Sequence, residues 1–397
     1  MTIGAYYYAW YGPGGQPWAS GALRPALDQA EEPLLSEYDS RDPAVIAQHY
    51  VWAQDFGVGV FLCSWHGPGS YDDETIRDDL LPSPARGPTK IALFYESIQR
   101  LGMGPDNLIH LTDASVATLV GDFDYMARTY FSDPGYYRID GRPVVIVYAS
   151  RRFRGDVAGA IAAVRTSVED LYGVDPYLIG DEVDWDDPPD PSRIALFDAI
   201  TGYTLYSITQ SPGWPAQTGF VTRMQRRMLQ FRRIALAEGV GFVPDAMPGF
   251  DSLAVRPQAD EHVLPRALGP LSSQTSLFTA TLSLAGSLVD PSLDLMAVTS
   301  WNEWFEDTQI EPTALGPPLV TGPTGLTAGY AFEPYGYSLL EVLQSFEQRW
   351  DAAHAPPERV KISRRGSERG TSAAGARDRP GAGADRRGAP ARLRPRR

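Results

Sequence analysis

The chain has 397 residues, of which 43% are hydrophobic and 11% aromatic, a composition that excludes an intrinsically disordered protein and allows a large buried core. Its formal net charge is −14, but residues 361–397 carry 12 Arg or Lys against 3 Asp or Glu, so that residues 1–360 hold about −23. This acidic body argues against nucleic acid or an anionic membrane surface as a partner, whereas a neutral sugar substrate is compatible with it.

Short apolar, β-rich runs alternate along the body of the chain with longer segments of helical periodicity. We predict strands at residues 3–10, 59–65, 91–96, 143–148, 177–180, 199–203, 241–244 and 295–301. We predict helices near residues 43–56, 74–81, 113–131, 156–172, 192–197, 217–238, 272–288 and 337–353. Apolar strands interleaved with helices indicate a parallel sheet buried on both faces, and eight such units form a (β/α)₈ barrel. The predicted fold is a single α/β TIM barrel over residues 1–355.

An open doubly wound sheet is the alternative fold. Such a sheet normally carries a glycine-rich phosphate turn after its first strand. The segment Gly12-Pro13-Gly14-Gly15 lacks the G-x-G-x-x-G spacing and a following helix, so we reject a nucleotide site there. The fifth unit of the barrel is its weakest, because residues 184–191 stand in place of a clear helix.

The end of the chain differs in composition from the body. From about Lys361 it consists mainly of Arg, Gly, Ala, Ser and Pro, with almost nothing to bury, so we predict a disordered tail over residues 356–397. The tail is interpreted as a dispensable extension, and an arm for nucleic acid or an acidic partner is the alternative.

Cys63 is the single cysteine, which excludes an intrachain disulfide, and its apolar surroundings indicate a buried structural thiol. No apolar run reaches the ~18–20 residues of a membrane span. The sequence enters its first strand without a leader, so we expect a cytoplasmic protein, or a secreted or periplasmic one if a leader precedes it. We expect a monomer without cofactor, membrane or nucleic-acid partner.

In a (β/α)₈ barrel, function lies at the carboxyl ends of the strands. These ends are rich in side chains that suit carbohydrate, because aromatic faces cover the C–H face of a sugar while hydroxyls, amides and carboxylates bind its hydroxyl groups. The substrate-binding residues predicted on this basis are Tyr8, Trp10, Trp65, Glu96, Tyr203, Asn302 and Trp304.

Glu303 and Glu306 form the strongest local signal, directly after the last apolar strand. Positions i and i+3 share a face in a helical turn but not in an extended strand, so a bend after the strand would bring both carboxylates into the mouth of the barrel. Two close acids in different environments can divide the acid and base roles of glycoside cleavage. We interpret the neighbouring Asp307 and Glu311 as surface charges.

The five histidines show no metal-binding spacing, and no H-E-x-x-H or paired Cys/His motif is present. A G-x-S-x-G elbow is also absent from the sequence. The sequence therefore disfavours metal-dependent and serine-nucleophile chemistry.

The segment WNEWFEDTQIEP, residues 301–312, resembles the signature WNEWHEGTQIEP of glycoside hydrolase family 99, the endo-α-mannosidase and endo-α-mannanase family. Four further segments resemble family motifs in the same order: residues 6–12, 38–49, 197–203 and 242–257. The last of these ends in Arg256-Pro257 and adds Arg256 to the predicted substrate-binding residues. The resemblance covers residues 3 to about 353.

The resemblance implies a (β/α)₈ barrel and retaining endo-cleavage of α-mannosidic links without a metal. It also implies that Glu303 acts as a base on the sugar 2-OH, which attacks C1 to give a 1,2-anhydro sugar. Glu306 would protonate the leaving oxygen and then activate water. Tyr203 matches a family tyrosine near the reacting sugar, and Glu96 matches the acid of the FHIEP segment.

The chain departs from the family pattern at several positions. Phe305 replaces the His of the motif, Asp307 replaces its Gly, Tyr95 stands near another family histidine, and residues 180–187 lack a further one. These departures leave open a related glycan other than mannan. The alternative function is a non-catalytic glycan-binding barrel or one associated with polysaccharide biosynthesis.

Overall fold

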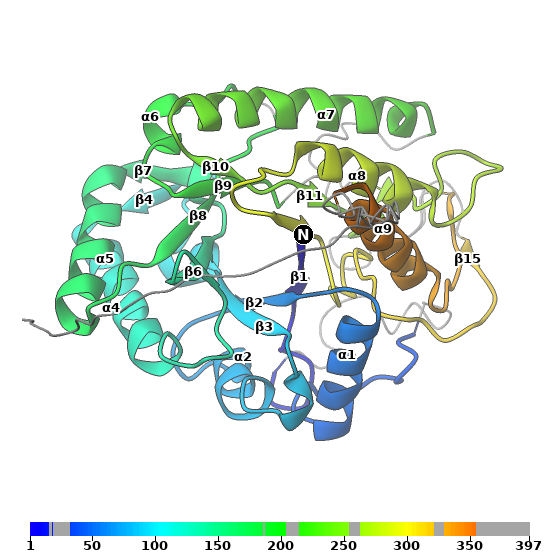
Figure 1. The fold of residues 1–397 in the computed structure, drawn as a ribbon, viewed down its shortest axis with the longest axis horizontal. Coiled ribbons are helices and arrows are strands. Elements are labelled where there is room, and N and C mark those ends of the chain that lie inside the picture. The colour runs from blue at the N-terminus through cyan, green and yellow to red at the C-terminus, as the bar shows by residue number, and fades with distance from the viewer. Residues whose placement is uncertain are drawn as a thin grey trace, which may run out of the picture. The chain divides into compact units, whose positions relative to one another are not determined.

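The parallel strands of the protein follow the apolar runs of its sequence. The computed structural model describes residues 1–15, 18, 32–185, 187–203, 214–253, 263–320 and 329–354. Within them, the main strands are β1 (Thr2–Tyr7), β2 (Val60–Trp65), β3 (Lys90–Tyr95), β6 (Arg142–Val147), β8 (Tyr177–Asp181), β9 (Ala199–Thr201), β10 (Gly241–Phe242), β11 (Asp245–Ala246) and β14 (Leu295–Val298), as Figure 1 shows in part. Each predicted strand has a counterpart among them.

These strands form one sheet that closes on itself. Its order is β10-β9-β8-β6-β3-β2-β1-β14-β11, and each neighbouring pair is parallel. β10 covers the first half of the seventh predicted strand, residues 241–244, and β11 follows directly after that strand. Between them, the Val243 N–H donates to the Ile200 carbonyl on one side, and the Pro244 carbonyl accepts from the Ala297 N–H on the other, both at 2.9 Å. The predicted (β/α)₈ barrel is therefore confirmed.

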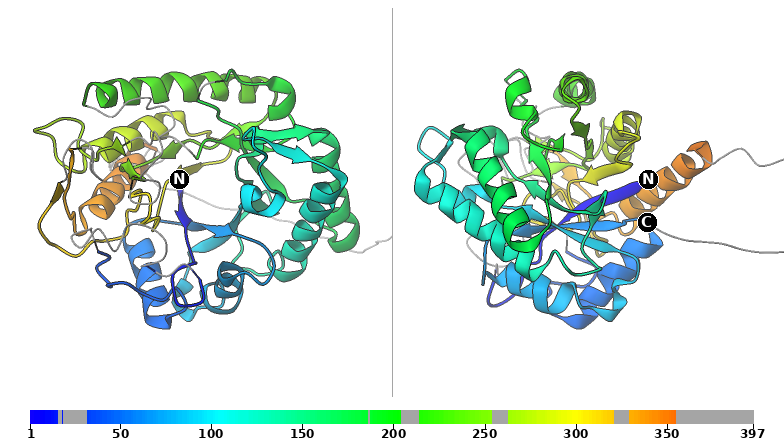
Figure 2. Two further views of the ribbon diagram at one scale, coloured as in Figure 1. Left: turned by 180° about the vertical axis from the view of Figure 1, so that it is seen from behind. Right: turned by 60° about the vertical axis from the view of Figure 1, so that its left-hand side comes forward.

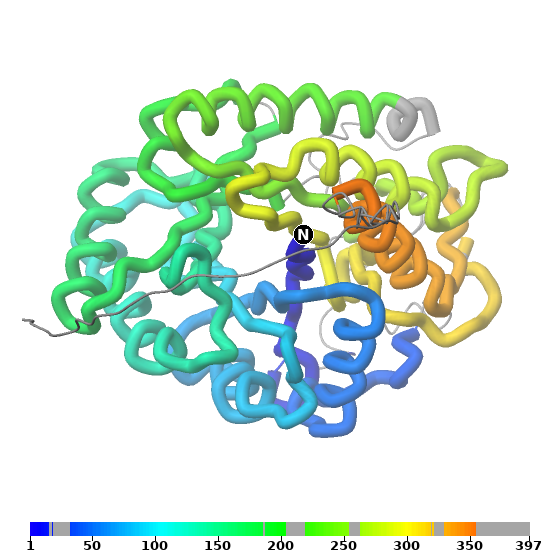
Figure 3. Tube along the Cα trace, in the orientation of Figure 1, coloured from blue at the N-terminus to red at the C-terminus, as the bar shows by residue number. Residues whose placement is uncertain are grey.

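The helices surround the barrel on the outside, as both views in Figure 2 show. The described ones are α1 (Pro43–Asp55), α2 (Tyr71–Thr75), α3 (Ser97–Leu101), α4 (Asp113–Thr129), α5 (Val157–Tyr172), α6 (Pro191–Ile194), α7 (Trp214–Ala237), α8 (Ser276–Leu288) and α9 (Ser338–His354). They follow one another around the ring in chain order (Figure 3), so that α9 lies beside α1, where the Gln344 amide donates to the Asp55 carbonyl at 2.6 Å.

Two helices differ from the prediction. The helix expected near residues 74–81 is α2, which continues as a π-helical turn over Ile76–Leu80. The helix expected near residues 192–197 is reduced to the four residues of α6, since the preceding Asp- and Pro-rich segment offers no helical run. Short strand pairs in the loops, which the sequence pattern does not predict, are β4 (Ile109–Leu111) with β7 (Phe153–Gly155), β5 (Arg138–Ile139) with β6, β12 (Phe250–Asp251) with β13 (Val263–Leu264), and β15 (Leu319–Val320) with β16 (Ala331–Phe332).

Local signals in the sequence fix several helix ends. The Asp42 side chain accepts from the Ala44 N–H before α1, and Pro43 occupies the first turn, where its missing N–H costs nothing. Thr112 and Ser115 form a reciprocal capping box at the start of α4. α5 ends at Gly173, whose φ of 66° lies in the left-handed region that glycine adopts most easily.

The core has two layers because side chains alternate along each strand. One set, with Tyr6, Leu62 and Phe94, fills the inside of the barrel. The other set, which includes Cys63 and Trp65, packs between the barrel and its helices. Cys63 is buried and unbonded, which agrees with the interpretation as a structural thiol. No helix in the described part of the chain is long and apolar enough to cross a membrane.

Candidate active site

The segment after β14 leaves the sheet in a tight loop that closes on itself. The Trp301 N–H still donates to the Tyr6 carbonyl at 2.7 Å, but the Ser300 N–H donates to the Thr308 carbonyl at 2.8 Å. Glu303 and Glu306 lie in the turns between these two contacts. The bend expected after the strand is therefore present, and it places both acids at the carboxyl end of the barrel.

Glu303 is held by its own turn. Its backbone N–H donates to the Ser300 hydroxyl at 2.9 Å, and its carboxylate Oε1 accepts from the Phe305 N–H at 2.9 Å. The side chain is buried, at 3% exposure, whereas Glu306 is half-buried. The two acids therefore sit in different surroundings, as a division of acid and base roles requires.

The charges of both acids raise the pKa values of the same two tyrosine hydroxyl groups. Burial raises the pKa of Tyr8 and of Tyr203, and the charges of Glu303 and Glu306 raise both further. The hydroxyls of the two tyrosines, which come from the ends of β1 and β9, are hydrogen-bonded to each other. Because both phenols stay protonated, this pair can donate toward an oxygen-rich ligand.

Glu96, directly after β3, joins the same group. Its Oε1 accepts from the Ser64 hydroxyl at 2.6 Å. Burial raises the pKa of Glu96 to about 7, the charge of His66 opposes this rise, and the charge of Glu306 adds to it. A carboxyl group with this pKa changes its charge near neutral pH, which is a common property of functional sites.

An aromatic rim flanks the acids. The half-buried Trp10 ring lies 4.6 Å from the Tyr8 ring, 5.7 Å from the His66 ring and 6.3 Å from the Phe305 ring, measured between centroids. The Trp10 indole nitrogen is buried and has no hydrogen-bond partner among the described residues. The rim thus offers an apolar surface, which suits one face of a sugar ring.

Asn302 lies at this end of the barrel but does not face a ligand. Its Oδ1 accepts from the Tyr8 N–H at 2.7 Å, and its Nδ2 donates to the Tyr8 carbonyl and the Tyr38 hydroxyl, each at 3.0 Å. The amide is fully buried, and both of its donors are used. The predicted substrate contact is therefore replaced by a structural role: Asn302 joins the end of strand eight to the end of strand one.

Trp304 and Glu311 also turn inward. The Trp304 indole N–H donates to the Glu311 carboxylate at 2.8 Å. The same carboxylate accepts from the Tyr38 hydroxyl at 2.8 Å and contacts His49 Nε2 at 2.9 Å. Trp304 is 1% exposed and Glu311 is completely buried. The interpretation of Glu311 as a surface charge is therefore wrong. The buried Trp304 ring holds the loop through its bond to Glu311 and is not presented to a ligand.

Trp65 lies outside the mouth. Its indole N–H donates to Asp73 Oδ1 at 2.7 Å, and its ring packs 6.0 Å from those of Tyr95 and Tyr125, in the layer between strands and helices. The prediction that Trp65 contacts substrate is wrong, because the alternation along β2 directs it outward. The residue that turns toward the mouth is His66, which the sequence interpretation missed although the same alternation predicts it.

Two predictions fall outside the described residues. These are the substrate contact of Arg256 and the disorder of the tail over residues 356–397. Within the described part of the chain, no group of three or more His, Cys, Asp or Glu side chains could hold a metal ion.

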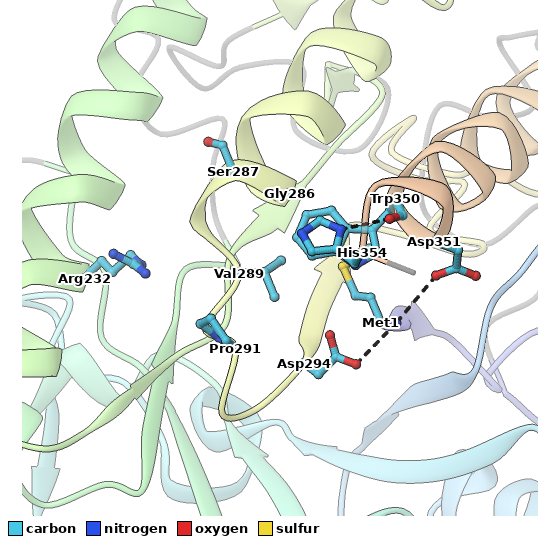
Figure 4. A pocket seen from close by; sticks show the side chains of 10 residues that line it. All are labelled: Met1, Arg232, Gly286, Ser287, Val289, Pro291, Asp294, Trp350, Asp351 and His354. Carbon is cyan, nitrogen blue, oxygen red and sulfur yellow. Dashed lines mark hydrogen bonds and ion pairs between the residues drawn. The ribbon is translucent and has the colours of Figure 1, made fainter. Parts of the chain in front are cut away.

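A separate pocket of about 830 Å³ lies at the opposite end of the barrel (Figure 4). Met1 and Asp294, which precede β1 and β14, line it together with Trp350, Asp351 and His354 from the end of α9. Because β1 and β14 run from this pocket toward Tyr8 and Glu303, it is distinct from the candidate active site.

Comparison with known proteins identifies the family. The profile of Glycosyl hydrolase family 99 matches residues 14–316, about three quarters of the chain. The chain belongs to this family. It is therefore a glycoside hydrolase, and the resemblance noted in the strand-eight motif reflects family membership.

Relatives of this family-99 enzyme include vertebrate proteins. A glycoprotein endo-alpha-1,2-mannosidase-like protein of Homo sapiens is 24% identical over 344 residues, which cover 77% of this chain and 67% of the human protein. The glycoprotein endo-alpha-1,2-mannosidase of Mus musculus is 25% identical over 345 residues, with the same two shares. The chain thus spans about two thirds of the length of these relatives.

Solved structures agree with the fold. The family-99 endo-alpha-mannosidase of Bacteroides thetaiotaomicron superposes with a TM-score of 0.61 at 19% identity, covering 89% of this chain and 98% of that one. A glycoside hydrolase-like protein superposes with a TM-score of 0.65 at 18% identity, covering 87% and 93% of the two chains. Both likenesses extend over most of the barrel.

Proposed function

We propose that this family-99 glycoside hydrolase is an endo-acting, retaining enzyme for α-mannosidic or closely related links, with Glu303 and Glu306 as its catalytic pair. The observation that carries the proposal is that one turn after β14 holds both acids where their charges act on the same tyrosine pair, Tyr8 and Tyr203. The relatives supply the linkage, since the mouse protein is named a glycoprotein endo-alpha-1,2-mannosidase.

In the first step, Glu303 takes the proton of the sugar 2-OH while O2 attacks C1. The bond from C1 to the leaving oxygen breaks, Glu306 gives that oxygen its proton, and a 1,2-anhydro sugar remains. The Phe305 N–H and the Ser300 hydroxyl support this role, because they fix the turn and carboxylate of Glu303 before the substrate arrives.

In the second step, the now ionised Glu306 takes a proton from water, which attacks C1. The bond from C1 to O2 breaks and O2 recovers its proton from Glu303. C1 is inverted twice, so the product keeps the anomeric configuration of the substrate. The greater exposure of Glu306 supports its part in this step, since it must meet both the leaving group and water.

The test compares wild-type protein with Glu303→Gln, Glu306→Gln and the control Glu74→Gln on α-1,2-linked mannan and a panel of related glycans. Glu74 is a partly exposed acid that, among the described residues, forms an ion pair with Arg41. We expect each active-site substitution to lower the release of reducing ends by about 10²–10⁴-fold and the control to have no effect. NMR of the first-formed product should show the α-anomer.

Unchanged turnover in Glu306→Gln, or a β-anomeric first product, would refute the proposed mechanism. Saturable glycan binding without hydrolysis by the wild-type protein across the panel would instead favour a non-catalytic glycan-binding barrel.

A further inference from the structure

Two residues outside the proposed catalytic pair meet where β2 and β3 end. In the parallel register of these strands Trp65 lies opposite Tyr95, and the Glu96 N–H donates to the Trp65 carbonyl at 3.1 Å. His66 and Glu96 are therefore neighbours, one residue beyond this pair. Because Trp65 and Tyr95 face the helices, the alternation turns both following side chains toward the inside of the barrel.

Asp72, at the start of α2, fixes the orientation of His66. One carboxylate oxygen of Asp72 accepts the His66 backbone N–H at 2.7 Å and lies 3.3 Å from Nδ1 of the imidazole. A ring nitrogen this close to a carboxylate oxygen carries a proton, because two lone pairs would repel. In the neutral imidazole Nε2 is then the basic nitrogen. The Trp10 ring lies beside the imidazole, with a centroid distance of 5.7 Å and an angle of 37° between the ring planes.

We propose that His66, oriented by Asp72, is a positioning residue that sets the charge of Glu96 in the active site. The proposal rests on the proposed function only for the nature of the ligand. Glu96 is the acid that a glycan hydroxyl would meet beside Glu306, and an ionised carboxylate accepts such a hydroxyl whereas a protonated one donates to it.

The charges around His66 favour this coupling. Burial lowers the pKa of His66, but the contact with Asp72 and the charge of Glu96 outweigh it, so that the pKa lies above its ordinary value even with Arg100 nearby. The opposing effect of Arg100 is limited, because its guanidinium is bound by both oxygens of Asp122 at 2.7 and 2.9 Å.

Several of the same groups also shift the pKa of Glu96. Burial raises the pKa of Glu96 to about 7, His66 and the Ser64 hydroxyl lower it, and the charges of Asp72 and Glu306 raise it. His66 and Glu96 therefore each favour the charged form of the other, so that a proton on the imidazole favours the ionised carboxyl group. Without His66, Glu96 would be protonated over more of the neutral range.

This inference can be tested without a substrate, by long-range ¹H–¹⁵N NMR of the full chain labelled at histidine. The sequence has five histidines, and single His→Gln variants assign their signals. We expect neutral His66 to carry its proton on Nδ1 and to titrate above the range of a free imidazole. In Glu96→Gln its midpoint should fall by about 1 pH unit, since an opposite charge is removed.

The control is a second His–Asp pair on the exposed surface. His110 Nε2 lies 2.8 Å from Asp106, and the NMR signals of His110 should be the same in Glu96→Gln as in the wild-type chain. A neutral His66 protonated on Nε2, or a His66 midpoint that does not respond to Glu96→Gln, would overturn the inference whether or not the protein hydrolyses glycans.

A kinetic arm separates this inference from the proposed function. On a glycan that the enzyme cleaves, His66→Gln should move the pH profile of kcat/KM in the wild-type background and leave it in place in the Glu96→Gln background. Equal shifts in both backgrounds would overturn the role of Glu96. Absence of hydrolysis together with the expected NMR result would refute the proposed function alone.

Discussion

The buried carboxylate of Glu311 should be one of the most sensitive positions for stability. Three donors converge on it: the Tyr38 hydroxyl, the Trp304 indole and His49 Nε2. In Glu311→Ala all three would remain buried without this acceptor, and each unsatisfied group costs about 1–3 kcal/mol. The three groups together amount to about 3–9 kcal/mol before the cavity is counted, so we expect a loss of at least about 4 kcal/mol, which approaches the ~5–15 kcal/mol of a typical domain.

Glu311→Gln should cost less, about 1–3 kcal/mol. The amide oxygen can still accept from Tyr38 and Trp304, although hydrogen bonds to a charged group are about twice as strong as neutral ones. The amide N–H₂ would face His49 Nε2 and could donate to it if the imidazole carried its proton on Nδ1 instead. Nδ1 lies 3.0 Å from the Tyr7 hydroxyl. Neutralising a buried acid also removes part of its desolvation cost.

The assay is urea unfolding at pH 7 and 25 °C, followed by tryptophan fluorescence. Glu74→Gln is the control, since its exposed ion pair with Arg41 should contribute no more than about 0.5 kcal/mol. The loss of unfolding free energy should increase in the order control, Glu311→Gln, Glu311→Ala. Unfolding of both Glu311 variants within about 0.5 kcal/mol of the control would refute the stabilising role of Glu311.

Three further predictions concern the mouth and its surroundings. The pKa of Glu96 rises from 4.5 to about 7 on folding, so its contribution to stability falls as pH rises through this range. Glu96→Gln should therefore be about 3 kcal/mol more stable than wild type at pH 8 and equal to it at pH 4, as pH-dependent urea unfolding would show. Trp65→Phe should lose about 1–2 kcal/mol of stability, through its lost bond to Asp73, without any change in glycan affinity by calorimetry. Trp10→Ala should raise KM about 10-fold with a smaller change in kcat, and a larger effect on kcat than on KM would contradict a role in binding.

The sequence predicted the barrel well because its signal is repeated. Apolar runs such as residues 60–65 and 295–298 can only be satisfied by burial on both faces, and their alternation with helices leaves few topologies. The prediction was least accurate in the fifth unit, where α6 has four residues. There the hydrophobic period is too short to define a helix, and tertiary contacts decide the path of the chain.

The site was harder to predict because residue type does not specify direction. Glu303 and Glu306 are marked by their position after an apolar strand, and the structure brings them together near Tyr8. By contrast, Trp65 and His66 are consecutive residues whose side chains point to opposite faces of the sheet. Trp65 was predicted to contact sugar because of its residue type, but its side chain points toward the helices. Glu311 shows the same limit, since its sequence neighbours do not reveal donors that come from about 260 to 270 residues away.

The amide of Asn302 has a consequence for how this loop could change over evolution. Its oxygen accepts from the Tyr8 N–H and its nitrogen donates to the Tyr8 carbonyl, a pair of bonds to one residue that a trans main-chain amide cannot make because its N–H and C=O point in opposite directions. The side chain thus satisfies both backbone groups of Tyr8 after the chain itself has turned away from strand one. Insertions or substitutions beyond position 302 would then change the loop without breaking the hydrogen bonds that join the ends of the first and last strands.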